Sequence, residues 1–579
     1  LLESLLSQKG NDNLLIIGAY RDNEIDASHP LNFFINALTE NGVPPVDIKL
    51  APLALADVQQ LVNDTVHTTS QQSDVLAEIC FNKSLGNPFY INQLLQSWYD
   101  NALIYFDQNL GCWEWTLVEL NAWKVSDNVA SLMADKFKVL PKNAMHILQV
   151  AAVIGTKFSM KVLASLCDIS IEEQANSLQL IMRNGLILPL DNNFTLLNNN
   201  GDITELDANF RFLHDQVHQA AYISLSENER AILHVKIGRF LRTVNDSSQL
   251  FVLVDHLNQA LPIIDSLKER IDLAQLNFKA AKKAKAANAY QTAIELLTHA
   301  LACLPKQSWL DYYEQSVALH LEFAECQFLV GNNDAALSHC DEIMLTLKEP
   351  TDKARFHCLQ TLIYSNQGLF AESLDYACKA IRMLGVHWPE DESEIAEEVE
   401  LQNKIIDDYL QKNIIKSLIV LPDMKDESQL LLNQILCICW PAALNVNLPM
   451  STLCVLKIVT QSIKFGNSPE SPFGYVNYGT MLTAQAQEYQ RGYEFGKLAV
   501  DLVEEKKNIA LKGKVYTMFG VTNSPWSTHL PENITLLRTA LAAGQESGDL
   551  IFTSHSAFHI LMLTQLAGFP IEKLLDYCQ

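Results

Sequence analysis

The sequence of 579 residues lacks several features that define whole classes of protein. No apolar run reaches the ~18 residues that cross a bilayer, and the opening LLESLLSQKGNDN lacks the basic, apolar and small-residue order of a signal peptide. Positive charge is scarce, because 42 Lys and Arg stand against 67 Asp and Glu, a formal charge of −25. That balance disfavours nonspecific binding to nucleic acid or to anionic lipid. We expect a cytoplasmic chain with no membrane span and no nucleic-acid partner.

The 12 cysteines form no recognisable metal or redox motif. The nearest pair, Cys437 and Cys439 in LCICW, lacks CxxC spacing, and most of the others lie in apolar, helix-like surroundings. We therefore expect reduced core thiols. His555 and His559 have the i, i+4 spacing of metal ligands, but no glutamate stands between them as in HExxH and no third ligand can be identified. We predict neither a metal site nor a catalytic set of residues.

The phosphate-binding loop G-x-x-x-x-G-K-[ST] is also missing. The only comparable pair, Gly513 and Lys514 in ALKGKVYTMF, has no earlier glycine and no strand before it.

Hydrophobic residues make up 48% of the chain, and its length suggests about three to five folded domains. The chain begins without Met and stops within a pattern at LLDYCQ, which indicates a fragment of a longer protein.

A short apolar run opens the part of the sequence that carries motifs. Leu14 to Gly18 is bounded by polar residues, which predicts a strand buried on both faces of a parallel sheet. Arg21 follows the C-terminal end of that strand, where such sheets bind ligands. The alternative is a solvated loop arginine that pairs with Asp22 or Glu24.

The next segments predict helices around a turn. HPLNFFINAL and ALADVQQLVNDTV have helical patterns, and VDIKLAPL between them is interpreted as an edge-like segment. Gly86, Asn87 and Pro88 then form a turn, with Pro88 at the start of an amphipathic helix, where proline is favoured.

Residues 129–230 predict a winged helix, since four helical patterns precede two strands, LILPL and ANFRFLHD, joined by a polar stretch. The helix in the recognition position carries Glu172 and Glu173 against one Arg183, which disfavours reading of the major groove. His214 and Asp215 begin the helix after the second strand; taken alone, they read as a buried histidine and an N-cap. His218, one turn on, is expected to pack or to lie at the surface.

The order GAYRDNE, L-x-PL, GNPFYINQLLQSWYDNALIYFD, CWEW and FLHD resembles the predicted ATPase module of large bacterial multidomain signalling kinases, which belong to the signal-transduction ATPases with numerous domains (STAND NTPases). The resemblance implies that Arg21 is a sensor near the γ-phosphate and that Gly86 to Pro88 is the G-x-P turn beside the adenine. His214 would be the histidine of an M-H-D element near the β-phosphate, with Leu213 in place of the methionine. The guanidinium of Arg21 suits contact with the γ-phosphate, because its planar fork of donors matches phosphate oxygens.

The same resemblance implies cofactors and partners. ATP or ADP with Mg would bind only together with Walker A and Walker B segments upstream of Leu1, so the fragment alone is expected to bind nucleotide weakly and to be inactive. Ser/Thr kinase, sensor and histidine kinase domains of a two-component system are expected in the parent chain.

The second half of the sequence is repetitive and helical. A small turn residue is followed five positions later by another small residue in three units, 43 and 37 residues apart: Asn288 and Ala293, Gly331 and Ala336, Gly368 and Ser373. This pattern is typical of tetratricopeptide arrays, which hold proteins or peptides on a concave surface. Two further candidates match less well: YQRGYEFGKLAVDLVEE, where Gly492 and Lys497 break the small-residue rule, and ENITLLRTALAAGQESGD. We expect four tryptophans to pack between helices: Trp309, Trp388, Trp440 and Trp526.

The expected fold is mainly α. It comprises the C-terminal piece of a P-loop α/β NTPase (1–55), a helical lid and linker (56–128), a winged-helix domain (129–230), connecting helices (231–272) and an α-solenoid of tetratricopeptide-like helix pairs (273–579). The expected function is an ATP/ADP-dependent regulatory switch and signal-transmitting scaffold. The alternatives are a helical-repeat scaffold that binds no nucleotide and a DNA-binding winged-helix regulator.

Overall fold

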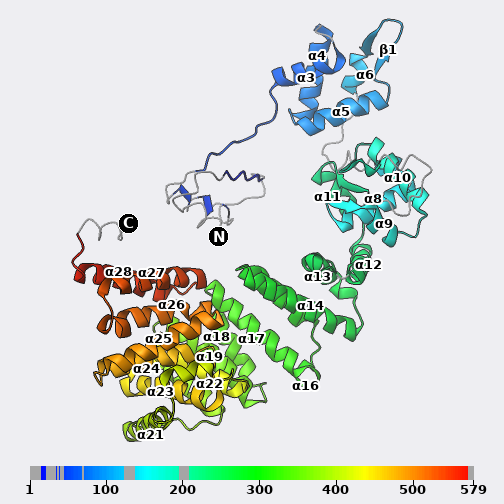
Figure 1. Ribbon diagram of the computed structural model, residues 1–579. Coiled ribbons are helices and arrows are strands. Elements are labelled where there is room, and N and C mark those ends of the chain that lie inside the picture. The colour runs from blue at the N-terminus through cyan, green and yellow to red at the C-terminus, as the bar shows by residue number, and fades with distance from the viewer. Residues whose placement is uncertain are drawn as a thin grey trace. The chain divides into compact units, whose positions relative to one another are not determined.

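The computed structural model describes residues 15–20, 31, 34–35, 38–39, 45–67, 71–122, 137–194, 208–244 and 246–570. It divides into two compact units, Leu1–Ser224 and Leu225–Gln579. Helices dominate both units (Figure 1). The prediction of a mainly α chain is confirmed.

The predicted strands of the first 50 residues are not formed. Residues 15–20 and 45–50 have no regular secondary structure, and Leu15 and Ile17 are 81% and 85% exposed. An apolar run becomes a buried strand only when neighbouring strands pair with it, and no described residue does so here. The predictions of a buried strand at Leu14–Gly18 and of an edge segment are therefore wrong for the described residues. Arg21 lies outside them.

The predicted lid region contains a β-hairpin as well as helices. The hairpin pairs Ile104–Asp107 (β1) with Cys112–Trp115 (β2) in antiparallel register. Its turn is closed by the carboxylate of Asp107, which accepts bonds from the backbone N–H groups of Asn109 at 2.7 Å and Leu110 at 3.2 Å. The prediction of a helical lid and linker did not include this hairpin. The helices around it are α3 (Leu55–Val66), α4 (Gln71–Ser84), α5 (Pro88–Asp100) and α6 (Leu117–Ala122).

The rest of the first unit packs helices against a three-stranded sheet. Its elements are α8 (Lys142–Ile154), β3 (Lys157–Ser159), α9 (Met160–Leu166), α10 (Ile171–Arg183), β4 (Ile187–Pro189), β5 (Asn209–Phe212) and α11 (Asp215–Ile223). The sheet order is β3-β5-β4, and both pairings are antiparallel. The predicted β4–β5 pair is present, whereas β3 was not predicted. Phe158 of β3 stacks on Phe210 of β5 with ring centroids 5.7 Å apart, which ties the added strand to the core.

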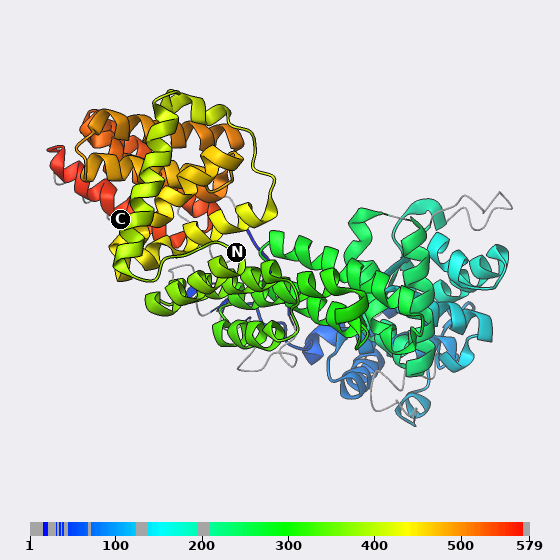
Figure 2. The same cartoon turned by 90° about the horizontal axis from the view of Figure 1, so that it is seen from below.

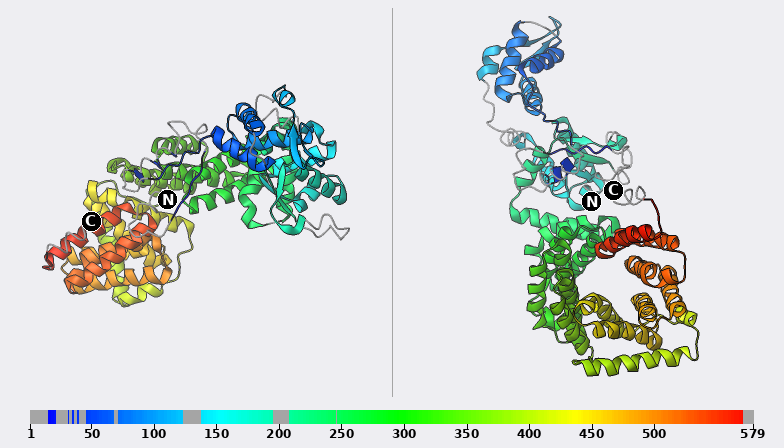
Figure 3. Two further views of the ribbon diagram at one scale, coloured as in Figure 1. Left: turned by 90° about the horizontal axis from the view of Figure 1, so that it is seen from above. Right: turned by 90° about the vertical axis from the view of Figure 1, so that its left-hand side faces the viewer.

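The second unit is built from helices that follow one another and lie side by side (Figures 2 and 3). Its first part contains α12 (Glu227–Val244), α13 (Leu250–Gln259), α14 (Leu267–Ala286), α15 (Tyr290–Cys303), α16 (Ser308–Asp311), α17 (Tyr313–Val330), α18 (Asn333–Met344), α19 (Pro350–Asn366) and α20 (Phe370–Met383). Its second part contains α21 (Glu392–Leu410), α22 (Glu427–Val446), α23 (Leu448–Phe465), α24 (Ser471–Ala484), α25 (Tyr489–Lys506), α26 (Ile509–Met518), α27 (Leu530–Ser547) and α28 (Leu550–Leu566). Short 3₁₀ segments at Ser247–Gln249, Leu261–Ile263, Ile415–Val420 and Ser524–Trp526 and a π-helical turn at Phe519–Asn523 complete it.

The predicted turn pattern is confirmed by the backbone. Asn288, Gly331 and Gly368 have φ of 59°, 95° and 75°, and each stands between two helices that pack together. The residues five positions later, Ala293, Ala336 and Ser373, are fully buried. A left-handed residue ends one helix, and the small side chain lets the next helix return close to it.

A fourth turn, between α24 and α25, also has a left-handed residue followed five positions later by a buried small residue, but at other positions than the sequence indicated. Gln487 has φ of 58° and takes the turn position, and Gly492 is the buried small residue five positions later. A Cβ atom on Gly492 would lie 2.1 Å from Thr483 Oγ1 and 2.8 Å from the Gly479 carbonyl oxygen. Gly492 therefore takes the small-residue position and not the turn position, so the departure from the rule that the sequence indicated at Lys497 is absent. Helices α24 and α25 pack so closely that only glycine fits there.

The aromatic and cysteine predictions are largely confirmed. Trp388 is buried in the core, and Trp440 packs edge-on against Phe473. Trp526 differs, since it is 62% exposed and stacks on Tyr489. Every described cysteine is free, and all except Cys112 and Cys378 are buried.

Among the described helices, α22 alone is long and apolar enough to cross a membrane by length and composition. Half of its most apolar stretch is buried, and it packs against α19, α20 and α23. The absence of a membrane span stays a prediction.

Candidate functional site

The G-x-P turn and the L-x-PL segment are joined by a backbone contact. The Leu53 N–H donates to the Gly86 carbonyl oxygen at 2.8 Å. Gly86 has φ of 76°, and a Cβ atom at this position would lie 2.2 Å from the Leu53 carbonyl oxygen. Both the conformation and the contact require glycine. The two motifs thus meet at one corner before α5.

Asn87 and Pro88 start α5 in the way that the sequence predicts. The Asn87 side chain accepts a bond from the Tyr90 N–H at 3.2 Å, which caps the helix, and Pro88 takes its first position. The turn therefore has a complete structural explanation, and its role beside an adenine stays a prediction.

His214 stands at the N-cap position of α11, directly after β5. The helix begins at Asp215, so the prediction that Asp215 is the N-cap is wrong. Asp215 takes the first helical position, where a carboxylate still interacts favourably with the helix dipole. Burial lowers the pKa of His214, Asp215 raises it and Arg211 lowers it, with burial the largest effect. The lowered pKa favours the neutral imidazole at pH 7.

His218 packs inside the unit, as expected. Its Nε2 lies 2.8 Å from the Ala152 carbonyl oxygen, and its ring meets Phe212 edge-on with centroids 5.1 Å apart. It holds α11 against α8.

The predicted nucleotide-reading residues belong to two clusters of elements. Gly86 and Pro88 lie among α3 to α6 and His214 lies among α8 to α11. Among the described residues, no group of three or more His, Cys, Asp or Glu side chains could hold a metal ion.

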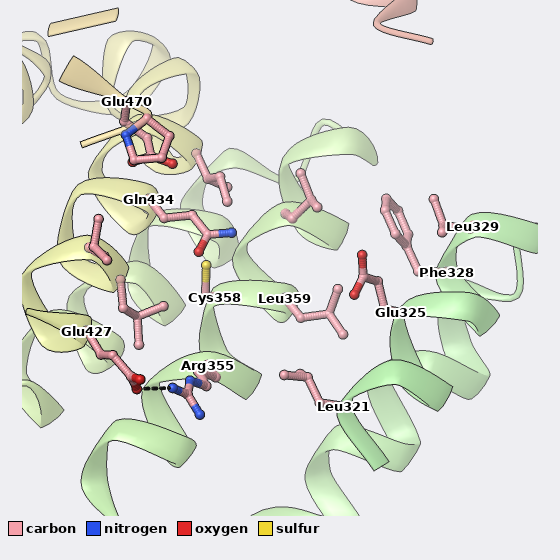
Figure 4. A pocket seen from close by; sticks show the side chains of 15 residues that line it. Leu321, Glu325, Phe328, Leu329, Arg355, Cys358, Leu359, Glu427, Gln434 and Glu470 are labelled. Atoms are coloured by element: carbon pink, nitrogen blue, oxygen red, sulfur yellow. Dashed lines mark hydrogen bonds and ion pairs between the residues drawn. The ribbon is translucent and has the colours of Figure 1, made fainter. Parts of the chain in front are cut away.

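A pocket in the second unit was not predicted. It has a volume of about 520 Å³ and lies between α17, α19, α22 and the residues that precede α24 (Figure 4). Most of its wall is apolar, and its lining includes Leu321, Phe328, Leu359, Leu362, Leu431 and Ile438. Each helix contributes residues three or four apart, which is the spacing of one helix face. Every amphipathic helix shows that spacing, so the sequence alone does not reveal the pocket.

Charged side chains border this pocket. Arg355 forms ion pairs with Glu427 at 2.9 Å and with Asp352 at 3.2 Å. Glu325 pairs with Lys285 at 2.9 Å, and Lys285 also pairs with Glu322 at 2.8 Å. Glu470 Oε2 is buried without a hydrogen-bond partner, and burial raises the pKa of this carboxyl group.

No family model matches the sequence. The chain is 24% identical over 632 aligned residues to hybrid signal transduction histidine kinase G of Dictyostelium discoideum, a match that covers 97% of this chain and 18% of that protein. It is 24% identical over 303 residues to the peroxide stress-activated histidine kinase mak3 of Schizosaccharomyces pombe, which covers 50% of this chain and 12% of that protein. The chain therefore spans less than a fifth of either curated relative.

Among solved structures, the chain is similar to a signal transduction ATPase with numerous domains that carries a tetratricopeptide repeat sensor, from Pyrococcus horikoshii. The identity is 12% and the TM-score 0.37, and the match covers 91% of this chain and 71% of that one.

Proposed function

We propose that the chain is a regulatory segment of a larger signalling protein of the histidine kinase kind. The observation that carries this proposal is the match over 97% of the chain to a hybrid signal transduction histidine kinase. The match covers only 18% of that protein, so the kinase chemistry is assigned to other parts of the natural protein. The helical repeats would hold a protein or peptide partner, and the first unit would read a nucleotide.

The nucleotide-reading role is the finer part of the proposal. With a phosphate-binding loop upstream, Arg21 would contact the γ-phosphate of ATP, and His214 would donate to a β-phosphate oxygen. Support comes from the position of His214 at the start of α11 and from its lowered pKa, which favours the neutral imidazole. Each nucleotide shifts the conformational equilibrium only by its different affinity for the two states, ATP toward an open form and ADP toward a closed one.

Photolabelling of the full-length natural protein tests this role. 8-Azido-ATP carries its reactive group on the adenine, so we expect labelled peptides that contain Gly86 to Pro88, with competition by ATP and by ADP. Arg21→Ala should weaken the competition by ATP about tenfold and spare ADP, because one charge-assisted contact is lost. His214→Ala should weaken the competition by ADP.

Matched controls are available within the first unit. Arg183 and His146 are exposed on α10 and α8, so Arg183→Ala and His146→Ala should leave both competitions unchanged. Labelling that misses this segment, or an unchanged ATP-to-ADP ratio in both test variants, would favour the alternative of a repeat scaffold that binds no nucleotide.

The acidic first turn of α10 argues against DNA binding by the proposed winged helix. Glu172 and Glu173 occupy the first turn of α10, and Ser170 caps it by accepting a bond from the Glu173 N–H at 3.3 Å. Two carboxylates at a helix start repel phosphate groups.

A further inference from the structure

We propose that the pocket between α17, α19, α22 and the start of α24 binds a peptide that carries one cationic side chain between leucine-like side chains. This inference rests on the proposed function, because it names the class of partner that the repeats would hold.

The volume and the apolar wall of the pocket suit side chains of that kind. A space of about 520 Å³ falls within the ~300–1,000 Å³ of ordinary ligand sites. Leu321 and Phe328 of α17 and Leu359 of α19 line it (Figure 4), and α22 adds apolar side chains that include Leu431 and Ile438. Apolar side chains of a partner would leave water on entering, which favours binding in proportion to the area buried.

The charges around the pocket leave a negative excess. Asp352 and Glu427 share the single cation Arg355. Glu322 and Glu325 likewise share the single cation Lys285. Of these residues Glu325, Arg355 and Glu427 line the pocket together with Glu470, so its lining has three carboxyl groups and one cation, and an entering anion would be repelled.

Glu470 gives the third and most specific argument. Its Oε2 atom is buried and has no hydrogen-bond partner, while hydrogen bonds with Ser468 and with the Glu470 backbone N–H act on the carboxyl group. A buried carboxylate oxygen without a donor is costly, and an ammonium or guanidinium group supplies the missing donor with opposite charge. Glu470 lies at one end of the pocket (Figure 4), so a cation there leaves the apolar wall free for neighbouring side chains.

Fluorescence polarisation with the 579-residue chain tests the proposal. The probes are two fluorescein-labelled peptides, SLLKLLS and SLLQLLS, which differ only in the central cation. We expect the lysine peptide to bind about tenfold more tightly than the glutamine peptide. Glu470→Gln should abolish that difference. Glu397→Gln, the same change at an exposed position on α21 away from the pocket, should preserve it.

Three results would overturn the proposal: equal affinity of the two peptides, a difference that persists in Glu470→Gln, or competition by hexylammonium as strong as by the unlabelled lysine peptide. The last would assign the pocket to a small amphiphilic cation. Thermal melting of each variant reports whether it folds. None of these results changes the photolabelling by 8-azido-ATP, so a failure here is distinguishable from a failure of the nucleotide-reading role.

Discussion

Gly86 combines a left-handed backbone with a contact that excludes any side chain. We predict that Gly86→Ala destabilises the α3 to α5 cluster, because a Cβ atom 2.2 Å from the Leu53 carbonyl oxygen forces the backbone apart. The left-handed conformation alone costs about 1–2 kcal/mol for alanine. Hydrogen exchange of the α3 and α5 amides measures the loss.

Gly111 provides the control for this substitution. It has φ of 66°, and nothing lies within 4 Å of an added Cβ atom. Gly111→Ala should therefore show only the conformational cost. Equal effects of the two substitutions would contradict a role for the Leu53 contact.

Two histidines of the second unit form a buried pair that should make it sensitive to acid. His234 and His256 lie with their Nδ1 atoms 2.8 Å apart, so one ring donates and the other accepts. Burial, then His256 and Arg230, lower the pKa of His234 to about 4, while Asp255 opposes them. Burial also lowers the pKa of His256.

The sign of the pH effect follows from these directions. An unfolded histidine has a pKa near 6.5. Between about pH 6.5 and pH 4 the unfolded chain therefore binds protons at these histidines, whereas the folded pair does not. Stability is complete above about pH 6.5 and falls as the pH drops toward 4, with a loss of roughly 2 kcal/mol for His234 at pH 5.

Substitution of one member of the pair tests this dependence. His234→Asn keeps a polar group near Nδ1 and cannot titrate, so the urea midpoint of α12 and α13 should fall less between pH 7.5 and pH 5 than in the unaltered chain. His299→Asn, at an exposed position on α15, should leave the pH dependence unchanged. Identical pH profiles for the unaltered chain and His234→Asn would exclude this pair as the cause.

At the scale of elements, small residues set the distance between paired helices. Ala336 is fully buried where α18 returns beside α17, and Ala335 next to it is exposed. We predict that Ala336→Leu destabilises the repeats by about 1–3 kcal/mol, because a well-packed interface does not accept added methylene groups. Ala335→Leu should stay within about 0.5 kcal/mol of the unaltered chain. Chemical denaturation of both variants provides the comparison, and equal midpoints would contradict the packing role of Ala336.

The sequence predicts the repeats better than the sheets for a physical reason. A left-handed turn residue and a buried small residue five positions later are local requirements, so Asn288, Gly331 and Gly368 were recognisable. The strand β3 has only three residues, and its partner Asn209–Phe212 is distant in the chain. Unlike β4, which lies in the apolar segment LILPL, β3 has a single apolar residue, Phe158, and is defined only by its pairing with β5.

The candidate sites also contain some features that local sequence predicts and others that depend on contacts between distant segments. The turn at Gly86 to Pro88 and the helix start near His214 follow from local residue chemistry. The contact of Gly86 with Leu53 and the meeting of Arg355 with Glu427 depend on packing between distant segments. The pocket needed the arrangement of α17, α19 and α22, which no residue spacing encodes.

At the scale of the whole molecule, the proposed role is control of a kinase that lies elsewhere in the natural protein. The ADP-bound, closed form would depend on His214. A variant that loses this contact should populate the active form more.

The autophosphorylation rate of the full-length natural protein, with ATP as the phosphoryl donor and with added ADP, tests this role most directly. We predict that His214→Ala raises the rate several-fold, while His146→Ala on the exposed face of α8 leaves it unchanged. A folded His214→Ala protein with the rate of the unaltered protein would contradict the proposed switch.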